Sequence, residues 1–187
     1  MRRFLTLLLL LALALPVRAV QVVLPIYPTG EAQQTPTASM ALNCGRFVMP
    51  DTILSMNRVS VNITTGFGDA VVMGFALYPD LDGGTAIFSS GGSLPASGSG
   101  VVSAAVTAFD LTGGVTYRLC FCATGTSGAY AAPRWLTGTA SVAALQNAVT
   151  PSVGVATNSC DASATPPATT GAIVPNTAVV PPLVVVE

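Results

Sequence analysis

The cysteines are the side chains in this sequence whose type and spacing most directly predict chemistry: Cys44, Cys120, Cys122 and Cys160. An even number of cysteines predicts disulfides if the chain reaches an oxidising compartment. Cys120 and Cys122 lie two positions apart on a predicted strand, with Cα atoms about 6.5 Å apart and side chains on one face, which disfavours a bond between them. The two remaining pairings both tie Cys44 and Cys160 to this strand, and both stay open.

The alternative use of these cysteines is soft-metal binding, in which thiolates and the thioether of Met49 or Met56 would hold copper(I). Their spacing does not match a known metal site. The sequence also lacks a Cys-x-x-Cys motif, which disfavours an oxidoreductase. Structural disulfides are therefore the prediction.

Two residue types that catalysis often needs are missing, because the sequence contains no histidine and no lysine. Their absence excludes Ser-His-Asp and Cys-His catalysis, a lysine Schiff base and histidine-bound zinc. Glycoside hydrolysis needs only two carboxylates. The candidates lie beside turn glycines or at expected strand ends, where aspartate is favoured for turn chemistry alone; they are Asp51, Asp69, Asp80, Asp82 and Asp110. We therefore expect no enzymatic activity and no resident cofactor.

Two groups of residues are candidate binding sites. Asp80 and Asp82, in an Asp-Leu-Asp-Gly-Gly loop, could hold calcium together with backbone carbonyls, although a third acidic ligand is missing and a solvated turn is the alternative. Tyr130, Arg134 and Trp135 could stack on and hydrogen-bond to a sugar. The alternative for Trp135 is burial at the end of the core.

The first residues predict export. Residues 1–19 combine a basic start with a predominantly apolar run of twelve residues and a small residue, Ala19, at the expected cleavage position. That run is too short to span a bilayer, and no later apolar run approaches spanning length. After cleavage, four arginines face eight acidic residues, for a net charge of −4, which excludes a basic nucleic-acid surface. We expect a periplasmic, cell-surface or extracellular protein.

The rest of the chain predicts strands joined by glycine-rich turns. Residues 57–65 alternate apolar and polar side chains, and residues 70–78 are almost continuously apolar. Further strands are expected at 85–89, 101–109 and 115–123, and 141–148 is the one expected helical turn. This pattern predicts an all-β fold, an antiparallel sandwich in a single domain.

The two ends have a different composition. We expect an extended arm at 20–39, the sandwich at 40–149, and a segment rich in proline, threonine, alanine and valine at 150–187, tied back through Cys160. Residues 179–187 are apolar and predict either a solvated tail or a strand or polyproline segment that docks on this domain or a neighbour. Because no lysine protects strand edges, self-association is a further expectation.

Three stretches resemble the jelly-roll β-sandwich domains of phage tail and bacterial surface proteins. Residues 57–59 open a strand that leads to 74–78, an acidic and glycine-rich loop follows at 80–84, and residues 111–117 carry leucine, a glycine turn and then tyrosine. The last stretch is also similar to fibronectin type III domains, where a tyrosine near this corner bonds back to the backbone. The resemblance implies a fold and no catalytic residue.

These observations favour an exported, disulfide-stapled, non-catalytic structural or adhesion module. One alternative is a carbohydrate-binding module that uses Tyr130 and Trp135. The other is a pilin-like subunit that a neighbour's extended end completes.

Overall fold

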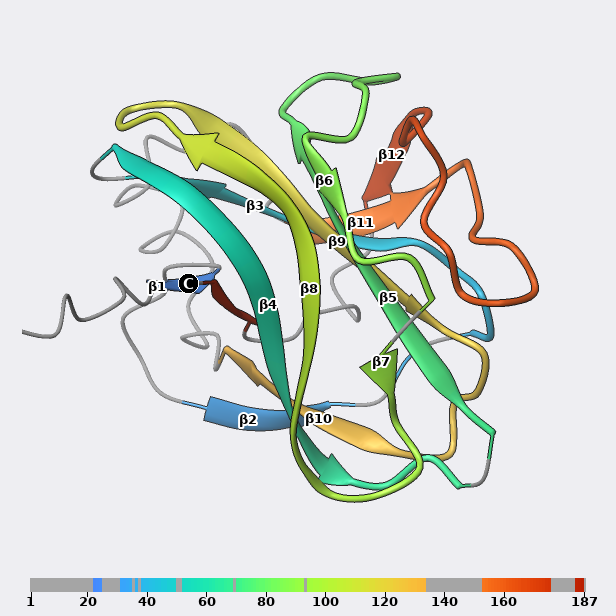
Figure 1. Ribbon diagram of the computed structural model, residues 1–187. Helices are drawn as coiled ribbons and strands as arrows, with labels where there is room; N and C mark the ends of the chain where they lie inside the picture. The colour runs from blue at the N-terminus through green and yellow to red at the C-terminus, as the bar shows by residue number, and fades with distance from the viewer. Residues whose placement is uncertain are drawn as a thin grey trace, which may run out of the picture.

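The computed structural model describes residues 22–24, 31–34, 36, 38–49, 52–68, 70–92, 94–133, 153–175 and 184–186. Within these residues the chain is all-β, without a helix, and every strand pair is antiparallel. The strands form two sheets, with β4 and β8 in front of β3, β9 and β5 in Figure 1. The predicted antiparallel sandwich is confirmed.

Sheet A is built around one long strand. Its six strands are β1 (Val22–Leu24), β2 (Glu31–Gln34), β4 (Ile53–Thr65), β8 (Gly100–Leu111), β10 (Ala129–Pro133) and β13 (Val184–Val186). β8 and β13 both pair with residues 59–61 of β4, and β8 and β10 both pair with Ile63. β8 therefore occupies one edge of β4 by itself, while β10 and β13 share the other.

Sheet B is centred on β9. Its seven strands are β3 (Asn43–Val48), β5 (Val72–Pro79), β6 (Phe88–Ser89), β7 (Leu94–Pro95), β9 (Thr116–Ala123), β11 (Val153–Ala156) and β12 (Ile173–Pro175). β9 lies between β3 and β5, while β6 and β7 both pair with β5.

The main core fills the space between the sheets. Alternate residues of β4 (Val59, Val61 and Ile63) face apolar side chains of β5 and β9 that include Phe75 and Phe121. Because successive side chains of a strand point to opposite faces, this alternation places one row of each strand in the core. Burial of each large apolar side chain stabilises the fold by roughly 1.5–3 kcal/mol.

A tyrosine fixes the corner between β8 and β9. The hydroxyl of Tyr117 accepts a hydrogen bond of 2.8 Å from the backbone N–H of Thr112, five residues earlier in the chain. The Tyr117 ring is buried and packs beside Phe47. The bond back to the backbone therefore has the form expected of a tyrosine at a sandwich corner.

The outer face of sheet B carries a second core. Residues 157–172, which we call the cover loop, connect β11 to β12 and cross this face. Cys160 and Ala164 of the loop pack with Ala76, Tyr78 and Cys122 of the sheet. The molecule therefore has three layers, and both faces of sheet B are covered, as its nearly continuous apolar strands require.

Four of the predicted strands appear with small shifts of their ends, as β4, β5, β8 and β9. The stretch 85–89 contains only the two-residue strand β6. The sheets also take in strands of the N-terminal arm and of the C-terminal segment. The expected helical turn at 141–148 and the signal peptide at 1–19 lie outside the described residues.

Candidate functional site

The predicted ligand-binding group is only partly described. Tyr130 lies in β10, where its backbone pairs with Ile63 on one side and Gln34 on the other. Arg134 and Trp135 lie outside the described residues. Their contact with a sugar stays a prediction.

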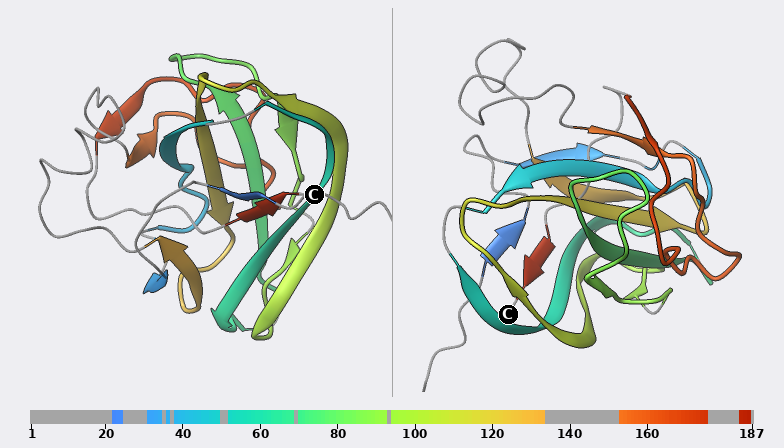
Figure 2. Two further views of the ribbon diagram at one scale, coloured as in Figure 1. Left: turned by 90° about the vertical axis from the view of Figure 1, so that its left-hand side faces the viewer. Right: turned by 90° about the horizontal axis from the view of Figure 1, so that it is seen from above.

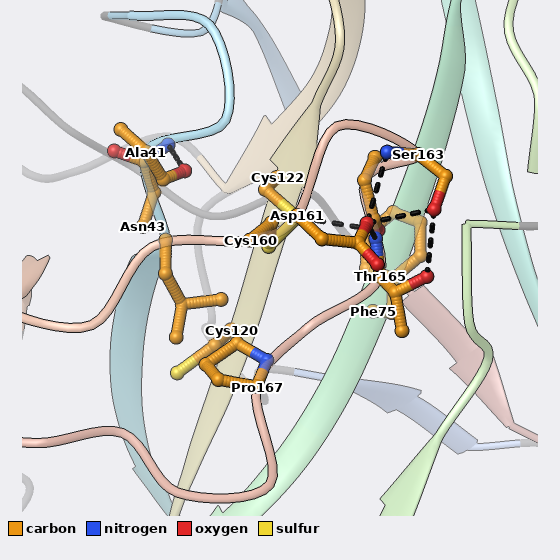
Figure 3. Close-up of a disulfide and its surroundings, with 12 residues drawn as sticks. Ala41, Asn43, Phe75, Cys120, Cys122, Cys160, Asp161, Ser163, Thr165 and Pro167 are labelled. Carbon is orange, nitrogen blue, oxygen red and sulfur yellow. Dashed lines mark hydrogen bonds between the residues drawn. A yellow bond between two sulfur atoms is a disulfide. The ribbon is translucent and has the colours of Figure 1, made fainter.

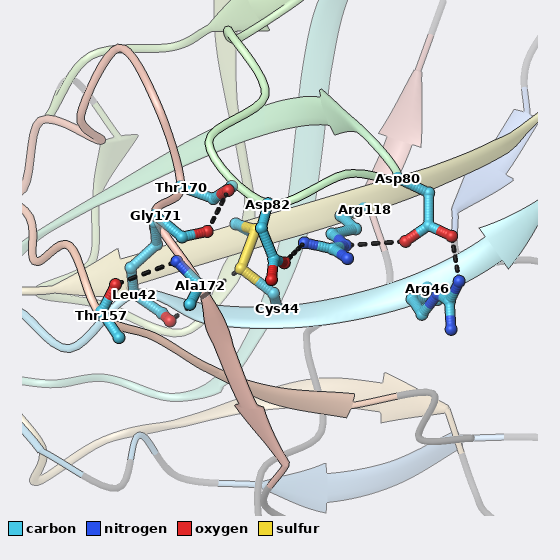
Figure 4. A network of polar contacts seen from close by, with 11 residues as sticks. Leu42, Cys44, Arg46, Asp80, Asp82, Arg118, Thr157, Thr170, Gly171 and Ala172 are labelled. Carbon is cyan, nitrogen blue, oxygen red and sulfur yellow. Dashed lines mark hydrogen bonds and ion pairs between the residues drawn. A yellow bond between two sulfur atoms is a disulfide. The ribbon is translucent and has the colours of Figure 1, made fainter. Parts of the chain in front are cut away.

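A row of charged side chains crosses one end of sheet B (Figure 4). Arg46 on β3 and Arg118 on β9 are directly opposite each other. The Asp80 carboxylate lies between them: it is bonded to the guanidinium of Arg46 and accepts a 2.7 Å hydrogen bond from Nε of Arg118. Nη1 of Arg118 donates a second bond, of 2.8 Å, to Asp82. The acidic loop after β5 therefore neutralises two like charges that the strand register places side by side.

These ion pairs bear on the calcium hypothesis for Asp80 and Asp82. Their carboxylates bind guanidinium groups, so two positive charges already lie where a divalent cation would need negative ligands. Within the described residues no group of three or more His, Cys, Asp or Glu side chains is placed to hold a metal ion. This geometry favours an ion-pair network at the loop over a calcium site.

Asp82 also links the network to β12, the strand that follows the cover loop. Its hydrogen bond from Arg118, together with a bond from the backbone N–H of Ile173, holds the pKa of the Asp82 carboxyl below its ordinary value. The side chain is 61% exposed, so water screens the pair and its contribution to stability is small.

The two disulfides lie side by side beneath the cover loop. Cys44 is bonded to Cys120, which is directly opposite on the neighbouring strand, and Cys122 is bonded to Cys160 of the loop. Figure 3 shows the second bond with the loop residues around it. The prediction of disulfides is confirmed, and the copper(I) alternative is wrong because no thiol is left free.

Beyond Cys160 the loop makes a tight turn around a carboxylate. Asp161 accepts hydrogen bonds from the backbone N–H and hydroxyl of Ser163, at 2.9 and 2.7 Å, and from the backbone N–H of Thr165, at 2.9 Å (Figure 3). These bonds lower the pKa of the Asp161 carboxyl. They also hold Ala164 in a left-handed conformation with φ of 57°. Asp161 is thus a turn-forming residue.

Two glycines let the cover loop approach the sheet. A Cβ atom on Gly74 of β5 would lie 2.0 Å from the carbonyl oxygen of Ala164. A Cβ atom on Gly92 would lie 1.5 Å from the carbonyl oxygen of Ser163. Both contacts are with backbone atoms, so a larger residue at either position would push the loop away.

Tyr78 fastens the next part of the loop. Its hydroxyl donates a 2.6 Å hydrogen bond to the carbonyl oxygen of Pro167, and the ring is fully buried. Burial raises the pKa of the Tyr78 hydroxyl well above its ordinary value, because the charged phenolate would lose its hydration. At neutral pH Tyr78 is therefore a buried hydrogen-bond donor.

The remaining candidate carboxylates do not form a catalytic pair in the described part of the chain. Asp110 accepts a 2.7 Å hydrogen bond from the backbone N–H of Ser55, across a register shift between β4 and β8. Asp51 and Asp69 lie outside the described residues. Asp80 and Asp82 serve the ion-pair row.

The ends of the chain enter sheet A as strands. Val184, Val185 and Val186 of β13 pair with Val61, Ser60 and Val59 of β4. On its other side β13 pairs with β1, so segments from the two ends of the chain lie side by side (Figure 2). Of the alternatives for residues 179–187, the described part 184–186 is a strand docked on its own domain and not a solvated tail.

The other edge of sheet A ends at β8. In the left-hand view of Figure 2, β8 forms the outer rim of the sheet beside β4. Its outward residues, such as Val101, Ser103 and Ala105, are exposed, and the Ser103 hydroxyl lies 2.7 Å from that of Ser60 on β4. Residues 100–109 of this rim carry no charged side chain.

Several structural residues escaped the sequence-based prediction. Arg46 and Arg118 occupy the strand face that also carries the cysteines, and the even spacing of Arg118, Cys120 and Cys122 was a usable signal. Tyr78 ends an apolar run and gave no signal of its own, because its partner is 89 residues away in the chain.

Comparison with known proteins gives no match to a family model, to a curated protein or to a solved structure. In the part of the chain that is described, no helix is long and apolar enough to cross a membrane.

Proposed function

We propose that this chain is an exported structural or adhesion module without a catalytic role. The observation that carries the proposal is the use of its reactive and charged side chains on sheet B. The four cysteines form two disulfides, and the aspartates of the acidic loop bind Arg46 and Arg118. These groups hold the cover loop and the strand ends in place, which is a structural task.

Two further features support export and a surface role. Disulfides of this kind persist in oxidising compartments, in agreement with the predicted signal peptide. Sheet A presents a long strand rim, residues 100–109 of β8, that carries no charged side chain and is partly exposed to solvent. Such rims favour association with other strands.

The mass of the oxidised protein, residues 20–187, tests the proposal. We expect light scattering over a concentration series to show defined oligomers or polymers. A strict monomer at every concentration would contradict a self-assembling structural role. A screen for glycan binding would follow, with Trp135→Ala as the variant that tests the carbohydrate-binding alternative.

A specific observation favours the pilin-like alternative as the second candidate. β13 is a short strand, and its described residues pair with β4 at three positions. The same strand from a neighbouring copy could make identical backbone bonds, which is the basis of strand exchange.

A complementation experiment separates strand exchange from other assembly. A chain shortened to residues 20–178 would expose this edge of β4, and a synthetic peptide of residues 179–187 should bind it and restore its stability. The matched control is the same peptide with Val185→Pro, because proline removes a backbone donor from the middle of the strand. Equal binding of both peptides, or binding of neither, would contradict strand exchange.

A further inference from the structure

The outer edge of β8 is the longest strand edge that the described structure leaves without a hydrogen-bonded partner strand. β8 has twelve residues, whereas the other outer strands β1, β2, β6, β7 and β12 have between two and four. On one side β8 pairs with β4. On the other side, no strand pairs with β8 and no backbone hydrogen bond joins it within the residues that can be described, although β6 and β7 of sheet B lie close to it. A free edge of this length presents a row of backbone donors and acceptors.

The side chains of β8 do not protect this edge. Residues 100–109 contain no charged side chain, and Asp110 is the first. Val101 is 71% exposed. Val102, Ala104 and Val106 pack against the main core but stay partly exposed at the rim. Natural sheets usually place lysine, proline or another protecting feature on such an edge.

We propose that β8 pairs with β8 of a second copy of this chain, antiparallel about a twofold axis perpendicular to the sheet. The proposal rests on the proposed function and names its assembly surface. Pairing of this kind would extend sheet A across two molecules and cover the partly exposed inner row of each. A twofold axis requires a surface to be complementary to itself. β8 meets this requirement because it brings no like charges together.

The strand pattern selects a register for this pairing. Residues that face each other across the two strands must point to the same side of the sheet. The twofold axis must therefore lie at a position where one residue faces the same residue of the second copy. With Ser103 on the axis, Val101 faces Ala105 and Val102 faces Ala104, so each valine meets a small side chain. The regular part of β8 ends near Ala105, where the register against β4 shifts. The register centred on Ser103 uses this regular part.

A charge placed on the rim tests the surface. In the oxidised protein of residues 20–187, Ala105→Lys should weaken self-association by about tenfold or more, measured by analytical ultracentrifugation, because lysine protects a strand edge. Asn62→Lys is the matched control: it adds the same charge at an exposed position on β4, opposite Val101 and away from the edge. Val174→Lys is a second control, because it adds the same charge at an exposed position on β12, at the edge of sheet B and away from β8.

A compensating pair tests the register. In the pairing centred on Ser103, position 105 of one copy faces position 101 of the other. Mixing the Ala105→Lys and Val101→Asp proteins would place opposite charges across the interface, and should restore dimers that neither protein forms well alone. Hydrogen exchange should show protection of β8 amides that rises with protein concentration. The amides of β12 should not change.

Each alternative outcome overturns the proposal in a recognisable way. Oligomers that tolerate Ala105→Lys but disappear when residues 179–187 are deleted would place assembly at the terminal strands and leave the proposed function standing. Equal weakening by Asn62→Lys would place the contact on the sheet face. Full protection of β8 in the most dilute sample would mean that its edge is covered within one molecule. A strict monomer would overturn this proposal and the self-assembling form of the proposed function, and would leave a monomeric adhesion module to be tested by the glycan screen.

Discussion

Removal of the disulfide between Cys122 and Cys160 should cost about 4 kcal/mol of stability. The bond joins residues 38 positions apart. In the chain-entropy model, closing a loop of that length removes about 4 kcal/mol of freedom from the unfolded chain. The bond between Cys44 and Cys120 spans 76 positions and gives about 4.5 kcal/mol. The two loops do not overlap in sequence, so their contributions should add.

Denaturation with urea measures the effect. With a slope near 2 kcal/mol per molar urea, the Cys122→Ala, Cys160→Ala double variant should unfold at a midpoint about 2 M lower than the oxidised parent protein. The Cys44→Ala, Cys120→Ala variant is the matched control, because it removes a disulfide from the same buried cluster on the same face of sheet B. Reduction of both bonds should remove about 8 kcal/mol, comparable to the whole stability of many domains.

The comparison between the two variants decides whether the reasoning holds. The entropy model depends on loop length alone, so it predicts nearly equal losses, although one bond joins adjacent strands and the other holds a loop. Only loss of the Cys122 to Cys160 bond should also speed hydrogen exchange in the cover loop. A loss below about 1 kcal/mol for the Cys44 and Cys120 variant would refute the entropic account and assign the stabilisation to native contacts.

Three further predictions concern the cover loop and its contacts with sheet B. Gly74→Ala should destabilise the protein by about 1–3 kcal/mol in urea titrations, since its Cβ would meet a backbone carbonyl, whereas Gly98→Ala, with open space around it, should be neutral or slightly stabilising. Tyr78→Phe should cost about 1 kcal/mol at neutral pH, by loss of a hydrogen bond, and should reduce the fall in stability above about pH 10, where the unfolded tyrosine ionises while the buried one resists. The hydrogen bonds that lower the pKa of Asp161 stabilise the fold at neutral pH, and this stability should be lost as the pH falls below about 4, where the carboxyl becomes protonated. Thermal melts of Asp161→Asn should therefore show a weaker acid dependence than the parent protein, and an unchanged profile would contradict this reasoning.

The central strands could be predicted from the sequence because their periodicity is strong. Residues 57–65 alternate, and the same alternation places Val59, Val61 and Ile63 in the core of the structure. The alternation of side chains along a strand also predicts that Cys120 and Cys122 lie on one face. It could not decide the pairing, because that depends on the register between β3 and β9, which brings Cys44 opposite Cys120.

The cover loop could not be predicted from local pattern. Its prolines, alanines and threonines have no periodicity, and they are ordered by contacts made far away in sequence: the disulfide to Cys122, the hydrogen bond to Tyr78 and the close approach to Gly74. The residues next to each of these partners in the sequence do not indicate that it contacts a distant loop. The composition predicts an extended segment, but the tight turn around Asp161 and the docking of the loop on a sheet depend on contacts that composition does not show.

The faces and edges of the two sheets are covered in different ways, and the functional argument depends on this difference. Sheet B is covered on both faces, its outer face by a loop that a disulfide secures, and its opposed arginines are neutralised by Asp80 and Asp82. Sheet A has one edge of β4 filled by short strands and its other edge formed by the long strand β8, whose residues 100–109 carry no charge. A protein that needed both sheets only for a stable monomer would gain from a charge on β8, at little cost, since the outward side chains there are exposed. The uncharged edge of β8 is therefore the place where assembly should be sought first.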